Sequence, residues 1–163
     1  MTAVFTTFMD DYALGVSLGI ANEQMQRANV VRIALEWERT PYIHQGRIKG
    51  KAADCTFFAK VFEEAGLMPA VEIPPYSHQA HLNRQGSMYL PIVERCARQE
   101  IKQNGVKPGD VVMYHVGRAW SHGGIVLDWP VILHADMGAG FVIRAEGDQG
   151  HFLDVPRRFF SFW

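Results

Sequence analysis

The sequence contains little cysteine, carries almost no net charge and lacks a long uncharged hydrophobic run. Two cysteines among 163 residues, Cys55 and Cys96, are too few for the disulfide framework of a small secreted scaffold. Sixteen basic residues balance 17 acidic ones, and the formal net charge of −1 gives no electrostatic case for binding nucleic acid or an acidic membrane. No apolar run approaches the roughly 18 uncharged residues that span a bilayer. We therefore expect neither a nucleic-acid partner nor a membrane span.

The N-terminal segment also lacks the features of a secretory signal peptide. It has apolar residues, but no basic region precedes them, and Asp10 and Asp11 interrupt the apolar stretch. We expect a protein made in the cytoplasm without a signal peptide. This expectation leaves open where the protein works afterwards.

The length and composition are those of one globular domain. Hydrophobic residues make up 48% and charged residues 20% of the chain, which is ordinary for a domain that buries its own core. The sequence shows no internal repeat, low-complexity tract or interdomain linker. We expect a single domain over residues 1–163, with residues 1–21 as a short helix or an N-terminal arm.

A loop that turns into a helix is predicted between Gly50 and Leu67, with Cys55 at the turn. Asp54 suits the N-cap, because its carboxylate can accept hydrogen bonds from amides that the first helical turn leaves unpaired. Gly66 suits the C-cap. The apolar side chains between these caps recur at the spacing of a helix that faces a core: Phe57, Phe58, Val61, Phe62 and Ala65.

The position of Cys55 gives it two possible roles. A cysteine at a helix N-terminus is favoured as a thiolate, which is the form that attacks as a nucleophile. The alternative is a buried cysteine that acts as a small apolar residue. This segment alone leaves the two roles about even. Cys96 falls among apolar neighbours in a predicted helix, which favours a structural role.

The rest of the pattern predicts helices early in the chain and strands late. We expect amphipathic helices over 22–39, with Asn22 as a possible N-cap, and over 87–103. The segment 68–86 between the helices should be irregular and exposed. From residue 104 the pattern changes to short β-rich runs separated by turns, over 111–115, 121–128, 131–136, 141–145 and 157–163. This order favours an α+β fold, with N-terminal helices packed on a C-terminal antiparallel sheet of about five strands.

Several histidines are candidates for chemistry. His78 and His81 are three residues apart, but no carboxylate or cysteine accompanies them at ligand spacing, so we expect no metal site there. His122 and His134 fall on two strands joined by the Trp129-Pro130 turn. Antiparallel pairing about that turn makes these two histidines cross-strand neighbours, about 5 Å apart.

A thiolate nucleophile needs a base, usually histidine, and often a third polar group that orients the base. The pair of His122 and His134 meets this need best. His115 and His151 are rivals for the base, but neither has a partner histidine across a tight turn. The alternative is two unrelated histidines on an exposed sheet face.

The order of these motifs resembles the NlpC-type cysteine peptidases of bacterial cell walls. The motifs that carry the resemblance are Asp54-Cys55 and the runs 107–112, 122–127 and 132–135. With the Tyr42 loop and the aromatic, arginine-bearing C-terminus, the resemblance covers roughly residues 37–163. It is nearest to the branch found in phage tails and gene-transfer particles.

The resemblance implies a papain-like fold with a Cys-His-His triad. Cys55 would be the nucleophile, His122 the base and His134 the residue that orients the base. Tyr42 and Asp54 match family positions near the nucleophile that help to bind substrate, and we include Thr56 with them as a substrate-binding residue.

Members of this family typically cut peptide bonds next to γ-D-glutamyl residues in peptidoglycan stem peptides, without a metal. The resemblance therefore implies a peptidoglycan peptide as substrate and no metal or other cofactor. It also implies phage tail proteins as partners, and action at the cell wall as part of a phage-like particle.

Two departures from the family pattern leave the cleaved bond open. Thr56-Phe57 stand where the family usually has Ser-Gly, and His44-Gln45-Gly46 stand where it usually has Trp-Gly-Gly. Cys-Thr followed by aromatic residues is also similar to the CHAP amidases, a related papain-like group. The alternatives are a CHAP-like amidase, acyl or amide transfer on a small molecule, and a non-catalytic phage tail structural or binding protein with the same fold.

Overall fold

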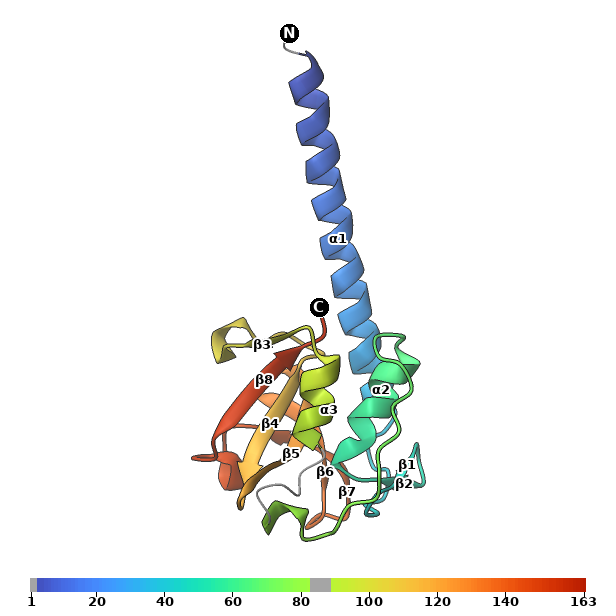
Figure 1. The fold of residues 1–163 in the computed structure, drawn as a ribbon, viewed down its shortest axis with the longest axis vertical. Helices are drawn as coiled ribbons and strands as arrows, with labels where there is room; N and C mark the ends of the chain where they lie inside the picture. The colour runs from blue at the N-terminus through green and yellow to red at the C-terminus, as the bar shows by residue number, and fades with distance from the viewer. Residues whose placement is uncertain (1–2, 83–88) are drawn as a thin grey trace.

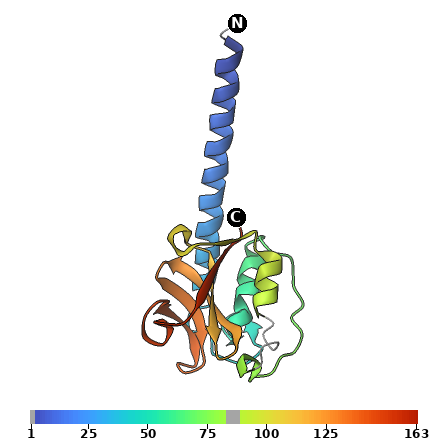
Figure 2. The same ribbon diagram turned by 60° about the vertical axis from the view of Figure 1, so that its left-hand side comes forward.

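A six-stranded antiparallel sheet with helices packed on one face forms the body of the protein (Figure 1, Figure 2). The computed structural model describes the backbone of residues 3–82 and 89–163, and their side chains outside 3–18 and 80. The helices are α1 (Ala3–Leu35), α2 (Phe58–Glu64) and α3 (Tyr89–Cys96), with short 3-10 turns at η1 (Cys55–Phe57), η2 (Ala80–Leu82), η3 (Gln103–Gly105) and η4 (Gly150–Phe152). None of the described helices combines the length and apolarity that a membrane crossing requires.

The strands of the sheet are β3 (Gln99–Ile101), β4 (Val111–Val116), β5 (Ala119–Asp128), β6 (Val131–Asp136), β7 (Phe141–Glu146) and β8 (Arg157–Ser161). Their order is β3-β8-β4-β5-β6-β7, and every neighbouring pair is antiparallel. Two short strands, β1 (Arg47–Ile48) and β2 (Ala52–Ala53), form a separate small hairpin before Cys55. The predicted α+β, papain-like fold is confirmed, and the five predicted strands correspond to β4 through β8.

The N-terminal helix is longer than predicted. α1 is one helix of 33 residues that continues through Asn22, so Asn22 is not an N-cap. Gly15 and Gly19 weakened the sequence signal, but a glycine inside a helix costs only about 1 kcal/mol and does not have to break it. Figure 1 shows the first half of α1 standing away from the body, while its last turns lie beside α2 and also contact β5.

Arg27 fastens α1 to the sheet. Its Nη1 donates to the Asp110 carboxylate and to the Pro108 carbonyl, both at 2.9 Å. Its Nη2 donates to the Ser161 hydroxyl at 3.2 Å, and its guanidinium lies 4.0 Å from the centroid of the Trp163 ring. Because these partners come from the start of β4 and the end of β8, one largely buried side chain ties the helix to two neighbouring strands.

The predicted turn around Cys55 is confirmed. Asp54 caps η1 by accepting a hydrogen bond from the Thr56 amide at 2.9 Å. α2 follows, and Gly66 ends it with φ of 73°, in the left-handed region that favours glycine. Contacts of η1 with β5 and β6 bring Cys55 to the sheet.

The predicted helix over 87–103 is wrong in its second half. Its first two residues lie outside the described part of the chain, and α3 ends at Cys96. The amide of Arg98 then donates to the Ser161 carbonyl, and the residues of β3 pair with β8. This pairing supplies backbone hydrogen bonds in place of those of a continued helix. Cys96 itself is partly buried against the core, as its predicted structural role requires.

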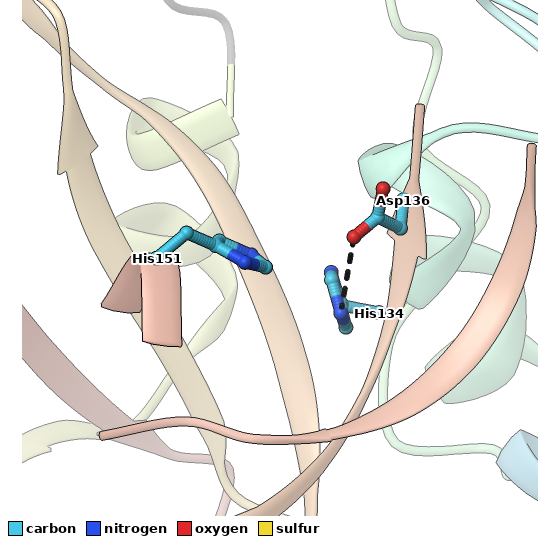
Figure 3. Close-up of side chains that lie close together, drawn as sticks. All are labelled: His134, Asp136 and His151. Atoms are coloured by element: carbon cyan, nitrogen blue, oxygen red, sulfur yellow. Dashed lines mark ion pairs between the residues drawn. The ribbon is translucent and has the colours of Figure 1, made fainter. Parts of the chain in front are cut away.

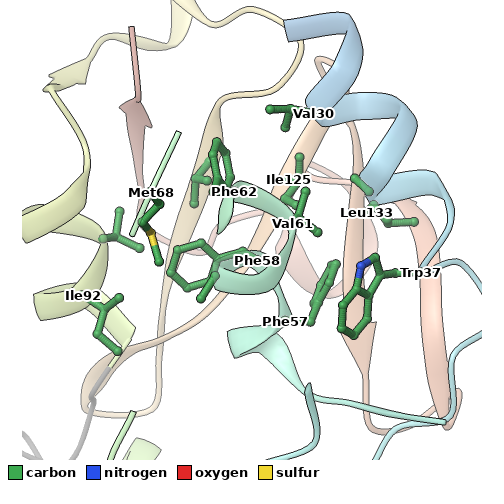
Figure 4. Packing of buried hydrophobic residues seen from close by; sticks show 14 of the residues in the cluster. Val30, Trp37, Phe57, Phe58, Val61, Phe62, Met68, Ile92, Ile125 and Leu133 are labelled. Atoms are coloured by element: carbon green, nitrogen blue, oxygen red, sulfur yellow. The ribbon is translucent and has the colours of Figure 1, made fainter. Parts of the chain in front are cut away.

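Both faces of the central strands β4, β5 and β6 are buried. On the helix side, the strands pack against all three helices in the larger core (Figure 4), which includes Val30, Trp37, Phe57, Phe58, Phe62, Ile92, Ile125 and Leu133. On the opposite side, a second cluster contains Val112, Tyr114, Val126, Ile132, Phe152 and Phe159. Successive strand side chains point to opposite faces, so each run of apolar residues in β4 and β6 fills both clusters.

Candidate active site

A cleft of about 530 Å³ lies where η1 meets strands β5 and β6. It is lined by Cys55 from η1, His122 from β5 and His134 from β6, the three residues that the sequence predicted to act together. The predicted substrate-binding residues Tyr42, Asp54 and Thr56 also border this cleft.

The Cys55 thiol reaches the sheet next to His122. Its Sγ donates to the carbonyl of Ser121 at 3.6 Å, and Ser121 directly precedes His122 in β5. Cys55 is partly exposed at the cleft, so a ligand can approach the sulfur.

The surroundings of Cys55 do not favour a thiolate, which is the form expected of a cysteine at a helix N-terminus. Burial raises the pKa of the Cys55 thiol, the neighbouring Asp54 carboxylate raises it further, and the amide of Cys55 itself lowers it by less. The predicted helix dipole is also small here, because Cys55 lies in a 3-10 turn before a helix of seven residues. The resting thiol is therefore protonated.

His122 and His134 are in direct contact, as the hairpin predicted. Nε2 of His122 lies 3.0 Å from Nδ1 of His134, and their rings meet edge to face with centroids 5.2 Å apart. The strand pairing places Ile125 opposite Leu133, and the next position along each strand sets Gly124 opposite His134. His122 is two residues from Gly124 on the same face of β5, so it is a diagonal neighbour of His134. A Cβ at Gly124 would lie 3.3 Å from Cβ of His134, so the missing side chain leaves room beside His134.

The protein around the two histidines keeps both rings neutral. Burial lowers the pKa of His122 to about 3, with a further contribution from His134. Burial also lowers the pKa of His134 to about 4, although Asp136 opposes this shift. Phe152 stacks on His122 with centroids 5.7 Å apart and meets the His134 ring at 5.2 Å, so one aromatic ring packs against both.

Asp54 holds the loop before Cys55 in place. Its side chain is buried, and its Oδ1 accepts from the Thr56 amide at 2.9 Å and from the Thr56 hydroxyl at 2.6 Å. Its Oδ2 accepts from the Gln45 amide at 2.7 Å and from the Tyr76 hydroxyl. Both carboxylate oxygens are therefore engaged within the protein.

Tyr42 and Tyr76 both border the cleft. Burial raises the pKa of Tyr42 to about 12, with smaller contributions from Cys55 and Asp54, so its hydroxyl is a neutral donor. Sequence reasoning singled out Tyr42 but missed Tyr76, because Tyr76 follows two prolines in a segment predicted to be an exposed connector. The prolines were the available signal, since they limit the conformations of that connector.

Other histidines also border the cleft. His44 stacks on His78 with centroids 3.9 Å apart, and His81 and His115 line the cleft as well. His151 comes from η4 and lies close to His134 and Asp136 (Figure 3). These three side chains offer ligand atoms within 4.8 Å of one another, a grouping that sequence reasoning missed.

Sequence comparisons identify the protein family to which this chain is similar. The sequence model of the NlpC/P60 family matches residues 39–152. No sequence among curated proteins matches this chain.

Solved structures match the fold. NlpC2 from Trichomonas vaginalis has a TM-score of 0.60 at 12% identity, over 85% of this chain and 46% of that one. The peptidoglycan hydrolase RipB from Mycobacterium tuberculosis has a TM-score of 0.55 at 16% identity, over 87% of this chain and 67% of that one. The NlpC/p60 domain of the peptidoglycan hydrolase SagA has a TM-score of 0.55 at 18% identity, over 81% of this chain and 96% of that one.

At these identities the structures show a shared fold alone, and the chain spans less than half the length of the T. vaginalis protein. The family match is stronger evidence, because it covers well over half of the chain and includes Cys55, His122 and His134. The chain belongs to the NlpC/P60 family.

Proposed function

We propose that the protein is a cysteine hydrolase that cleaves an amide bond in peptidoglycan stem peptides, with Cys55, His122 and His134 as its triad. The observation that carries this proposal is the hydrogen-bonded histidine pair, which lines the same cleft as the Cys55 thiol. Cys55 acts as nucleophile, His122 as base and His134 as the positioning residue.

The contact between the histidines decides which nitrogen takes the proton. Nε2 of His122 is engaged with His134, so Nδ1 is the nitrogen left to accept the proton of the thiol. For Nδ1 to be unprotonated, Nε2 of His122 must carry the hydrogen and donate it to Nδ1 of His134. His134 thus selects the tautomer in which His122 can act as a base.

The reaction then follows the course of acyl transfer to a thiol. The Cys55 proton moves to His122 while the sulfur attacks the amide carbonyl, and backbone amides at the start of η1 stabilise the oxyanion. His122 gives this proton to the leaving amine as the carbon–nitrogen bond breaks. Water then attacks the thioester with His122 as base, which releases the acid and restores the thiol.

The resting protonation states favour a proton transfer coupled to attack. Burial raises the pKa of Cys55 and lowers that of His122, so a separated thiolate and imidazolium would be costly in the free protein. In the proposed mechanism, Cys55 loses its proton to His122 only as the sulfur attacks the carbonyl carbon of the bound substrate. This differs from a preformed thiolate, the form that the predicted place of Cys55 at a helix N-terminus favours.

The finer substrate assignment rests on the family resemblance. We infer a bond next to a γ-D-glutamyl residue, with Tyr42, Asp54 and Thr56 supporting substrate binding. Tyr42 offers a hydroxyl at the cleft, whereas Asp54 and Thr56 are buried and act by holding the loop that carries Cys55. A CHAP-like amidase would use the same triad on a different amide.

Mass spectrometry of muropeptides tests this proposal. Purified muropeptides are incubated with wild type, Cys55→Ala and, as a matched control, Cys96→Ala. We expect the same fragments from wild type and Cys96→Ala and none from Cys55→Ala, and the fragment masses would identify the bond. Full activity in Cys55→Ser, or no cleavage by wild type on any muropeptide, would contradict the proposal.

We further propose that the protein belongs to the phage tail branch of its family and has phage tail proteins as partners. The resemblance to phage tail and gene-transfer proteins supports action at the cell wall as part of a phage-like particle. Recovery of the protein with assembled particles, rather than free in the lysate, would test this. A non-catalytic tail protein with the same fold is the competing function, and absence of cleavage by wild type would favour it.

A further inference from the structure

Nε2 of His134 faces away from His122 and has no hydrogen-bond partner among the described residues. The side chain is only 1% exposed, so water does not readily satisfy this nitrogen. A buried polar atom without a partner costs free energy, and such atoms are uncommon in folded proteins. Nε2 of His134 could therefore bind a group or ion held by the neighbouring side chains.

Two side chains from different elements face that nitrogen. Asp136, at the end of β6, places Oδ2 at 3.9 Å from Nε2 of His134, too long for a hydrogen bond. Its Oδ1 accepts from the Ala139 amide at 2.9 Å, which fixes the carboxylate. Figure 3 shows His151 extending from the opposite side toward the same space.

The three groups make a recognisable donor set for a transition metal. One ligand atom from each of His134, Asp136 and His151 lies within 4.8 Å of the others. Zinc binds imidazole nitrogen and carboxylate oxygen at about 2.0–2.2 Å, commonly with three protein ligands and an open fourth position. Binding would draw the three ligand atoms closer together than they lie in this structure, and His151 is the exposed member of the three.

We propose that His134, Asp136 and His151 bind a divalent metal ion of the zinc class at the edge of the active-site cleft, and that the bound ion inhibits hydrolysis. The binding part follows from the three side chains alone. The inhibitory part rests on the proposed function.

Inhibition follows from the tautomer that the metal imposes. A neutral imidazole has one N–H, so a metal on Nε2 of His134 leaves the hydrogen on Nδ1, which then donates to Nε2 of His122. The hydrogen of His122 must now sit on its Nδ1. That nitrogen can no longer accept the proton of Cys55, and the base is lost without any displacement of the triad.

Isothermal titration with Zn²⁺ tests the site separately from activity. We expect one ion per chain in wild type, in Cys55→Ala and in His115→Gln, a control that changes another cleft histidine. His151→Gln should weaken binding at least about tenfold, because it removes a ligand. No binding by wild type, or equal binding by wild type and His151→Gln, would overturn the site.

Cobalt separates this site from a simple thiol adduct. Co²⁺ at the proposed site should give visible absorption without a sulfur-to-metal charge-transfer band, and the spectrum should persist in Cys55→Ala. A charge-transfer band that disappears in Cys55→Ala would place the ion on the nucleophile and overturn the proposal.

Hydrolysis assays test the inhibitory part. Saturating Zn²⁺ should suppress muropeptide cleavage by wild type and by His115→Gln but not by His151→Gln. Equal cleavage by wild type with and without bound Zn²⁺ would overturn the inhibition. If wild type cleaves nothing even with a chelator present, the proposed hydrolase fails, and the titration and the cobalt spectrum still decide the metal site.

Discussion

Nε2 of His122 and Nδ1 of His134 lie 3.0 Å apart across the neighbouring strands β5 and β6. One hydrogen must lie between these nitrogens, and its position decides whether His122 can act as a base. In the proposed mechanism, His134 thereby sets the tautomer of His122.

This relationship predicts how substitutions of His134 affect hydrolysis. His134→Ala removes the acceptor, and we expect kcat to fall about a hundredfold because His122 loses its tautomer and orientation. His134→Asn can still accept through its amide oxygen, which stands at the position of Nδ1, and should retain activity within about tenfold of wild type. Measurement of kcat across pH checks this, since a merely structural role would lower stability without changing the shape of the pH profile. Equal activity of His134→Ala and wild type would contradict it.

The protonated thiol predicts the pH dependence of alkylation. Because burial raises the pKa of Cys55, its reaction with iodoacetamide should be slow at pH 7 and should rise about tenfold per pH unit through pH 9. Peptide mass spectrometry separates Cys55 from Cys96 and gives each rate. A fast rate at Cys55 that is already constant below pH 7 would reveal a preformed thiolate instead.

The two neutral histidines predict a loss of stability in acid. Their folded pKa values, about 3 and about 4, lie below the ordinary 6.5 that applies to the unfolded chain. At a pH between the folded pKa and 6.5, each histidine binds a proton in the unfolded chain but not in the folded protein. The free energy of unfolding therefore falls as pH decreases below 6.5. Each histidine contributes at most about 1.4 kcal/mol per pH unit.

Urea unfolding at pH 7, 6 and 5, with a chelator present, measures this effect. His122→Gln and His134→Gln should each give a flatter dependence of the unfolding free energy on pH than wild type. Gly105→Ala, which changes no titratable group and has open space for the new Cβ, serves as the control and should leave the dependence unchanged. The same slope in all four proteins would show that the buried pair does not govern stability in acid.

Asp54 should be important for stability as well as for the position of Cys55. Asp54→Ala leaves the Thr56 and Gln45 amides without their acceptor, and we expect the free energy of unfolding to fall by about 2–4 kcal/mol. Asp128→Ala, at an exposed position, should change it by less than about 0.5 kcal/mol. Chemical denaturation compares the two, and similar effects would argue against Asp54 as the residue that holds this loop.

Gly123 is predicted to tolerate no side chain. A Cβ at this position would lie 2.3 Å from Cε1 of Tyr89 and 2.7 Å from the carbonyl oxygen of Val112. Gly123→Ala should therefore reduce stability by about 1–3 kcal/mol. Gly105→Ala, where no atom lies within 4 Å of the new Cβ, is the matched control. A melting temperature for Gly123→Ala equal to that of Gly105→Ala would contradict the close packing.

The fold was predictable where a local pattern matched the tertiary environment. The strands β4 through β8 are β-rich runs bounded by turns, and the sheet buries both faces of β4, β5 and β6. β3 was missed because its three residues continue an apparent helical pattern, and only pairing with β8 makes them a strand. The long α1 was missed because two glycines hide a helix that tolerates them.

The candidate site was predictable where residues close in sequence determine which side chains come together. The hairpin between β5 and β6 forces His122 and His134 together, and the Asp54 cap places Cys55 at a turn. The protonation states were not predictable, because they depend on burial by residues distant in sequence. His151 joins His134 and Asp136 through packing after β7, which no spacing in the sequence encodes.

The place of β8 in the sheet bears on how the protein is made. β8 is the last strand in sequence, yet it lies between β3 and β4. A nascent chain that ends before Arg157 leaves one side of β4 open and β3 without its partner. Open strand edges pair readily with other chains, so the ribosome-bound protein passes through an aggregation-prone stage that ends only when β8 emerges.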